Sequence, residues 1–369
     1  MMSMSNKLFL FDLTVPLTYY TYQLYSYSRQ SEYVMGFENE IKWEENNQIK
    51  DNVETNVDKM YFHIFCNYEK DNSIVPEDHF ICEIKNIIAE NESEAYKFIH
   101  PRLYKICRTL SFTMNMYNDY KNCFQPRVEV DFGNLLWSKR PYKFNNTNNN
   151  VQQLNEDINI AIHIADQIVT KVYTKGISNM SLENFFEYFN STNSDLNYML
   201  DELYLALGKE NVQSKFFHLF SIMEFIEKRF IKFSGASNLL TEDEVDKIVK
   251  YLSNIDMDFG KDKIEKITNT FRSNMLKMTD YGRATKLANI LNYMGIKKIK
   301  YLNETIGVNG KEVAQIIKIR NCLFHGDVNG LKEDIDKKIQ IAVEKLLIIC
   351  GMIIEWVAGT DNAGINCDG

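Results

Sequence analysis

A ten-residue stretch near the end of a long helical region, residues 318–327, reads KIRNCLFHGD. It places Arg320 five positions before His325, with Asn321 beside the arginine and apolar residues between them. Arginine stays protonated in proteins and offers a planar fork of donors that fits a phosphate. Histidine takes up and releases a proton near neutral pH. The stretch therefore predicts phosphodiester chemistry on RNA that needs no metal ion.

Helical spacing places these side chains on different sides of the predicted helix. At 3.6 residues per turn, Asn321 and His325 are about 40° apart on one face, and Arg320 is offset by about 100° from Asn321. The buried side is expected to be lined by apolar residues, namely Ile316, Ile317, Cys322, Leu323 and Phe324. A plainer interpretation stays open, because an arginine and a histidine near a helix end are also typical of helix-dipole partners and surface side chains.

The hexapeptide at 320–325 resembles the Arg-x4-6-His signature of the HEPN superfamily, in which a polar residue, frequently Asn, directly follows the arginine. Gly326 and an upstream predicted helix at 216–227, FFHLFSIMEFIE, resemble in particular the HEPN domain of ApeA-type anti-phage proteins, over about residues 195–359. HEPN proteins that a partner nucleotidyltransferase AMPylates carry a tyrosine two residues after the histidine. Asp327 occupies that position here. The chain is therefore a poorer match to the toxins that are controlled by AMPylation.

The resemblance implies a metal-independent endoribonuclease that acts in anti-phage defence by abortive infection, or as a toxin. The RNA 2′-hydroxyl would attack its own phosphate and leave 2′,3′-cyclic phosphate and 5′-hydroxyl ends. His325 would transfer protons, Arg320 would bind the non-bridging phosphate oxygens, and Asn321 would orient the histidine or the phosphate. HEPN proteins dimerise so that two motifs share a cleft, and a homodimer with a composite active site is expected, without a cofactor. Glu224 is expected to hold Arg320, with an exposed helix acid as an equal alternative.

Charge is distributed unevenly along the chain. The 369 residues carry a net charge of −8, whereas residues 261–330 contain 13 Lys and Arg against 6 Asp and Glu. The segment that carries the motif is therefore basic. Four lysines are candidates for RNA binding, namely Lys297, Lys298, Lys300 and Lys318. A solvated helix face explains such a run equally well.

Cysteine spacing and hydropathy indicate the compartment. The seven cysteines lie at positions 66, 82, 107, 123, 322, 350 and 367, without a close-paired framework, which is typical of a reducing cytosol. The longest apolar run, residues 346–354, is far below the roughly 20 residues that a membrane span needs. The first residues lack a signal-peptide pattern. A cytoplasmic protein is predicted.

Hydrophobic patterning predicts an α+β protein, with a mixed, strand-containing N-terminal domain followed by an all-α HEPN-like bundle. Residues 1–142 would form the N-terminal sensing or regulatory domain, which could respond to a phage-derived trigger or another partner. An Asn-rich linker at 143–153 would precede the all-helical region 154–359, and residues 360–369 would form a flexible tail.

The elements follow from period-two and period-3.6 patterns. Strands are expected at 8–22, 60–67, 79–84 and 127–137, and the acidic stretch 32–59 is expected to be a loop or an exposed edge. Helices are expected at 91–116, 154–173, 180–189, 194–207, 212–233, 241–252, 261–278, 283–294, from about 311, and at 331–357. The helix at 241–252 is expected to begin at a capping box formed by Thr241-Glu242-Asp243-Glu244.

Two short His-x-x-Cys runs, at 63–66 and 79–82, could in principle supply zinc ligands. Residues three apart on a strand point to opposite faces, so the sequence favours two strands of a hairpin. Phosphate-binding loop, dinucleotide-binding and zincin motifs do not occur in the sequence. Two other function classes stay open. One is a non-catalytic helical module that binds RNA or a nucleotide, and the other is a scaffold whose basic residues dock an acidic partner.

Overall fold

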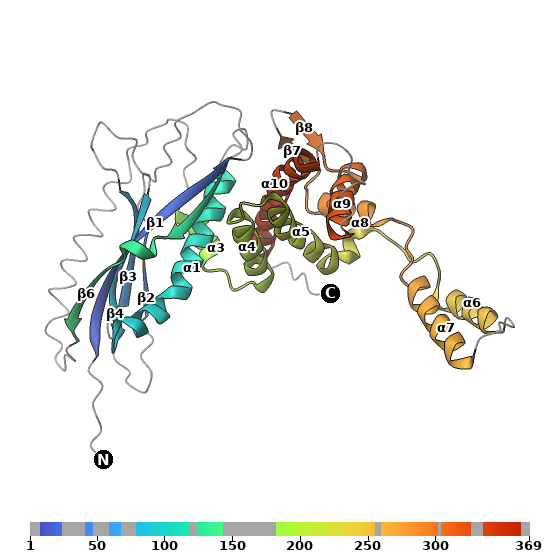
Figure 1. The fold of residues 1–369 in the computed structure, drawn as a ribbon, viewed down its shortest axis with the longest axis horizontal. Coiled ribbons are helices and arrows are strands. Elements are labelled where there is room, and N and C mark those ends of the chain that lie inside the picture. Colours follow the sequence, from blue (N-terminus) through green and yellow to red (C-terminus); the bar gives the residue numbers. More distant parts are fainter. Residues whose placement is uncertain are drawn as a thin grey trace, which may run out of the picture. The chain divides into compact units, whose positions relative to one another are not determined.

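The computed structural model describes residues 8–23, 41–46, 59–67, 79–117, 124–142, 182–254, 260–301, 304–325 and 335–362. An antiparallel sheet comes first and helices follow, which confirms the predicted α+β class (Figure 1). The chain divides into two compact units, Met1–Leu207 and Gly208–Gly369.

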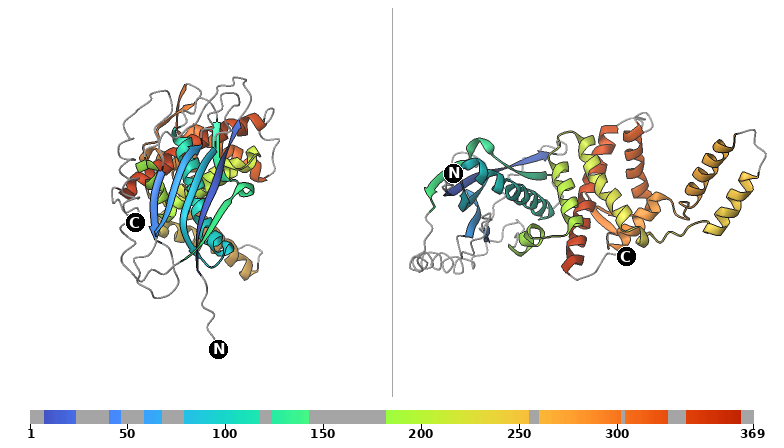
Figure 2. Two further views of the ribbon diagram at one scale, coloured as in Figure 1. Left: turned by 90° about the vertical axis from the view of Figure 1, so that its left-hand side faces the viewer. Right: turned by 90° about the horizontal axis from the view of Figure 1, so that it is seen from below.

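The first unit is built on an antiparallel sheet. Its strands are β1 (Phe9–Gln23), β2 (Ile41–Asn46), β3 (Lys59–Asn67), β4 (His79–Ala89), β5 (Phe124–Val130) and β6 (Leu136–Pro141). Their order is β2-β3-β4-β1-β5, and β6 also pairs with β1. Figure 2 shows the strands side by side, seen onto the sheet.

One face of this sheet is buried, because buried and half-buried side chains alternate along its strands. On β1, Phe11, Leu13, Val15 and Leu17 are each at most 1% exposed, while the residues between them are half-buried. Helix α1 (Glu92–Tyr117) contributes buried residues at spacings of three and four, namely Ala95, Ile99, Leu103, Ile106 and Leu110. These side chains belong to the same core as those of β1.

The sheet also shows what the sequence patterns missed. Strand β2 lies inside the acidic stretch that was expected to be a loop or an edge, and it is the edge strand. The strand-like run at 127–137 is divided by a short 3-10 helix, Phe132–Asn134, where the Asp131 carboxylate accepts a hydrogen bond from the Gly133 N–H. A capped turn of this kind ends β5, and β6 then continues along β1 in the same direction, because both strands are antiparallel to β1.

Two further helices, α3 (Leu182–Phe189) and α4 (Ser194–Leu207), pack against α1. Arg108 on α1 reaches Asp201 on α4 at 2.7 Å, and the Tyr204 hydroxyl donates to the Val128 carbonyl at 3.0 Å. The first compact unit therefore extends to Leu207. The Asn-rich run at 143–153 and the helix expected at 154–173 lie outside the described residues.

The second unit is mainly helical. Its elements are α5 (Val212–Arg229), η3 (Ile231–Ser234), α6 (Glu242–Ser253), α7 (Lys261–Met275), α8 (Arg283–Tyr293), β7 (Lys298–Tyr301), β8 (Glu304–Gly307), α9 (Gly310–His325) and α10 (Ile335–Asn362). Helix α10 packs along α5, and α9 packs along α8. None of the described helices has an apolar stretch long enough to cross a membrane.

Side-chain caps fix where these helices begin. The predicted capping box is confirmed, because the Thr241 hydroxyl and the Glu244 carboxylate exchange hydrogen bonds with each other's backbone N–H groups. Asn309 caps α9 by accepting from the N–H groups of Lys311 and Glu312, at 3.0 and 3.2 Å. The helix that carries the motif thus begins where the sequence predicted. The β7–β8 hairpin before it was not predicted.

Candidate functional site

Arg320 lies near the end of α9 with its guanidinium directed towards α5. Its Nη2 donates to Glu224 Oε1 at 2.9 Å, and its Nη1 makes a long hydrogen bond of 3.4 Å to Asn321 Oδ1. The guanidinium carbon lies 3.9 Å from the centre of the Phe324 ring, within cation-π range. An acid, an amide and a ring therefore hold this arginine in one orientation, with 21% of its side chain exposed.

Glu224 is shared by two arginines. Arg283, near the start of α8, places its Nη2 3.2 Å from Glu224 Oε1 and 2.7 Å from Glu227 Oε2. Glu224 and Glu227 are three residues apart on α5 and so lie on the same face. The sequence predicted that Glu224 would contact Arg320, and the structure brings them together. It did not predict Arg283 or Glu227, although the Glu-x-x-Glu spacing was a usable signal.

Aromatic rings form one wall of this cluster. The Phe217 and Phe324 rings meet edge to face, with centroids 5.0 Å apart, and Phe220 lies 5.6 Å from the Arg283 guanidinium. Phe324 was expected on the buried side of α9, and that expectation was wrong, because the side chain is 57% exposed. The helix ends one residue later, so the ring packs on Phe217 and Arg320 rather than into the core.

The opposite side of α9 is open to solvent and carries Lys318, Asn321 and His325, all exposed. Lys318 and His325 are seven residues apart and therefore about 20° apart around the helix, whereas Arg320 and His325 are about 140° apart. Among the described residues, no hydrogen bond or ion pair joins Arg320 to His325. The structure thus groups Arg320 with Asn321 and Glu224 and leaves His325 exposed at the end of the helix.

The other predicted RNA-binding lysines lie on and beside strand β7. Lys297, Lys298 and Lys300 are exposed, while Ile299 between the last two is buried. The two lysines of β7 therefore point to the same side of the hairpin. The hairpin is tied to α10 by the Tyr301 hydroxyl, which donates to Glu344 Oε2 at 2.5 Å.

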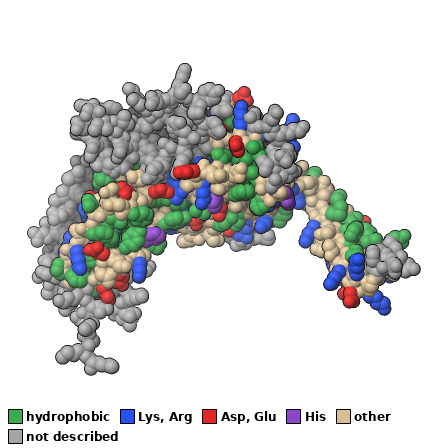
Figure 3. Space-filling model, in the orientation of Figure 1, with side chains coloured by type: hydrophobic (Ala, Val, Ile, Leu, Met, Phe, Trp, Pro, Cys, Tyr) green, Lys and Arg blue, Asp and Glu red, His purple; other side chains and the backbone are tan. Residues whose placement is uncertain are grey.

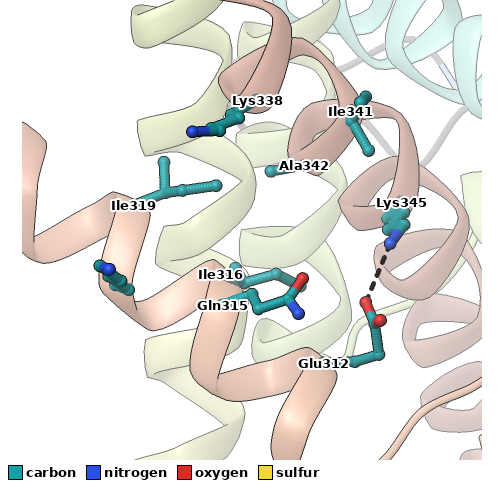
Figure 4. A pocket seen from close by; sticks show the side chains of 9 residues that line it. Glu312, Gln315, Ile316, Ile319, Lys338, Ile341, Ala342 and Lys345 are labelled. Atoms are coloured by element: carbon teal, nitrogen blue, oxygen red, sulfur yellow. Dashed lines mark hydrogen bonds and ion pairs between the residues drawn. The ribbon is translucent and has the colours of Figure 1, made fainter. Parts of the chain in front are cut away.

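Lys318 also lines a pocket of about 290 Å³ between α9 and α10 (Figure 4). Its apolar part is aliphatic and comes from Ile316, Ile319, Ile341 and Ala342. Three lysines, Glu312 and Gln315 complete the lining, and Lys345 is bound to Glu312 at 2.9 Å. The volume lies just below the ~300–1,000 Å³ typical of ligand pockets.

The His-x-x-Cys runs belong to two paired strands, which confirms the predicted hairpin strands. His63 on β3 lies opposite Glu83 on β4, and Cys82 lies opposite Ile64 in the buried face. His63 and Cys82 therefore point to opposite sides of the sheet. Within the described ranges, no group of three or more His, Cys, Asp or Glu side chains is placed to hold a metal ion.

Comparison with known proteins finds no relative, since no protein-family model, curated protein or solved structure matches this chain. The resemblance to HEPN proteins therefore stays a prediction that depends on the 320–325 hexapeptide and its helical surroundings.

Proposed function

We propose that the chain is a metal-independent endoribonuclease of HEPN type whose working site is formed by two chains. The observation that carries this proposal is the position of Arg320. Glu224 and Phe324 hold its guanidinium in one orientation near the end of α9, whose solvent-exposed side carries Asn321 and His325. A fixed phosphate-binding group and a titratable imidazole are the minimum that RNA cleavage by 2′-hydroxyl attack requires.

Arg320 keeps binding capacity for a phosphate. A guanidinium has five N–H donors; the described contacts of Arg320 use one donor of Nη2 and one of Nη1, and its Nε is buried, so one N–H of each Nη group is left for a phosphate. The Arg283 guanidinium forms an ion pair with the same oxygen of Glu224. Because that carboxylate is shared between two cations, it does not fully neutralise Arg320, which can stabilise the extra negative charge of the phosphorane.

Two chains are invoked because the motif at 320–325 supplies one imidazole per chain. Cleavage requires a base for the 2′-hydroxyl and an acid for the leaving 5′-oxygen. The roughly 140° between Arg320 and His325 also directs them to different sides of α9. In a two-fold dimer the motifs of both chains would share one cleft, and the two histidines would supply base and acid there.

The biological setting follows only from the resemblance. By analogy with HEPN proteins, the chain acts in the cytoplasm in anti-phage defence or as a toxin. The sheet-containing unit senses a phage-derived trigger or another partner, and RNA cleavage then halts growth. Lys297, Lys298, Lys300 and Lys318 would bind the phosphates that flank the cleavage site, which makes binding dependent on salt concentration.

The test is RNA cleavage in the presence of EDTA by the wild type, Arg320→Ala and His325→Ala, with analysis of the product ends. We expect 2′,3′-cyclic phosphate and 5′-hydroxyl ends from the wild type, and at least a hundredfold loss of rate in each variant. Matched controls are His100→Ala, an exposed histidine of α1, and Arg140→Ala, an exposed arginine of β6 that is paired with Asp12. Wild-type rates in both site variants would refute the assignment.

The second candidate is a non-catalytic module that binds RNA or a nucleotide. It is favoured by the environment of His325, because among the described residues no side chain orients the ring, as a general base commonly requires. The same experiment separates the two candidates. A binding module retains RNA on a filter in a manner that depends on Arg320, and it leaves the RNA ends unchanged.

A further inference from the structure

The hairpin formed by α6 and α7 has almost no core of its own. Among the residues of these two helices, only Val245 and Thr268 are buried. Most of the stability of a helix in a protein comes from packing of its apolar face, and helices of 12 and 15 residues are marginal in water without it. The hairpin therefore needs a packing partner.

Apolar side chains that could meet a partner are concentrated here. Thirteen large hydrophobic residues of the described chain are exposed, and six of them lie within residues 239–281. On the helices these are Tyr251, Ile267 and Phe271, which are 73%, 39% and 46% exposed. Ile267 and Phe271 are four residues apart and form one stripe on α7. Figure 3 shows apolar side chains along the hairpin, with Lys and Arg side chains beside them.

The ends of the hairpin are tied together. The Ser237 N–H and hydroxyl both donate to the Asp280 carboxylate at 2.9 Å, and the Leu239 N–H donates to the Met278 carbonyl at 3.0 Å. The chain therefore enters and leaves the hairpin through one paired neck. This neck keeps the two helices together as a unit, so their exposed face is a single surface.

The two helices carry opposite charges. Helix α6 has four acids and two lysines, and α7 has four basic residues and two acids. Arg272 of α7 already bridges to Glu242 and Asp246 of α6, at 3.0 and 2.8 Å. The net charges of −2 and +2 cancel over the two helices, and the connection between them adds Asp256 and Asp258. A hairpin without excess positive charge does not attract a nucleic acid or an anionic membrane, but its two helices complement each other.

We propose that the α6–α7 hairpin is a self-association surface that binds the same hairpin of a second copy of this chain. A two-fold axis places the acidic α6 of one copy against the basic α7 of the other, twice. The stripe of Ile267 and Phe271 then becomes buried in a four-helix arrangement of two hairpins. This inference concerns a different surface from the Arg320 region and does not rest on RNA cleavage.

Sedimentation equilibrium of the full chain tests the proposal. We expect the wild type to self-associate, and the double variant Ile267→Glu, Phe271→Glu to have an association constant at least tenfold lower. Both side chains are exposed, so the substitutions leave the fold intact, which circular dichroism checks. The matched control is Phe132→Glu, which alters an exposed aromatic residue of the first unit, 60% exposed, and should associate like the wild type. Equal average masses for the wild type and the double variant, or a monomeric wild type, would overturn the proposal.

A charge exchange identifies the partner as a second copy. Asp243 on α6 and Lys266 on α7 are exposed and lie outside the Arg272 ion pairs. Asp243→Lys and Lys266→Glu should each weaken association, and an equal mixture of the two variants should associate more strongly than either alone. A mixture no stronger than its components contradicts the pairing of α6 with α7 across two copies.

Discussion

Glu224 accepts hydrogen bonds from two guanidinium groups, and the geometry of the candidate site depends on it. Replacing it with Gln keeps the shape but removes the charge that holds Arg320 and Arg283 side by side. The two cations then repel each other, and Arg320 loses its fixed orientation. We expect Glu224→Gln to slow single-turnover RNA cleavage about tenfold, within the range expected when a positioning group is lost.

The neighbouring acid supplies the control. Glu227 contacts Arg283 and no other arginine in the described ranges, so Glu227→Gln should slow cleavage less than Glu224→Gln while costing similar stability. Partly exposed ion pairs contribute about 1 kcal/mol or less to the free energy of unfolding, so both variants should stay folded. Equal cleavage rates for the two variants would show that Glu224 does not position Arg320.

At the scale of single elements, the sequence predicts features that neighbouring residues determine, and it does not predict those that depend on contacts between distant residues. The starts of α6 and α9 could be predicted because Thr241 and Asn309 form caps within a few residues of sequence. The β7–β8 hairpin could not, because strands of four residues are too short to show a period. The ion pairs of Arg283 join residues 56 and 59 positions apart, and no sequence period encodes them.

Helix α5 carries a buried lysine whose positive charge lowers the free energy of unfolding. Lys215 is 1% exposed, and burial lowers its pKa to about 8 from 10.5. The unfolded chain therefore binds the proton more tightly than the folded chain. This destabilisation, up to ~3 kcal/mol, is fully present below pH 8 and disappears as the pH rises towards 10.5.

Lys215→Met should accordingly raise the free energy of unfolding at pH 7 by about 1–3 kcal/mol. The difference between the variant and the wild type should narrow between pH 8 and pH 10, and urea unfolding of both proteins over that range measures it. Lys228→Met, at an exposed position of the same helix, should change stability little at any pH. A Lys215→Met effect that is the same at pH 7 and pH 10 would contradict a neutralised lysine.

At the scale of the whole molecule, the fold class could be predicted and the division of the chain could not. Composition and periodicity distinguish a strand-rich first part from a helical second part. They do not reveal that α4 is bound to the sheet unit, because that depends on contacts such as Arg108 to Asp201 and Tyr204 to Val128. The motif residues and the angular separation of Arg320 from His325 could be predicted from residue types and helical spacing, whereas the Arg283 ion pair and the position of the Phe324 ring became clear only with side chains in place.

Because Arg320 and His325 of one chain are directed to different sides of α9, we propose that two chains complete one RNA-cleaving site. The direct measurement is the cleavage rate per wild-type chain as increasing His325→Ala chain is mixed in, with RNA in excess over all chains so that the variant does not compete for substrate. If each site needs a histidine from both chains, a ninefold excess of the variant lowers the rate per wild-type chain to about one tenth, because about one wild-type chain in ten still finds a wild-type partner. A rate per wild-type chain that stays constant would contradict the shared site.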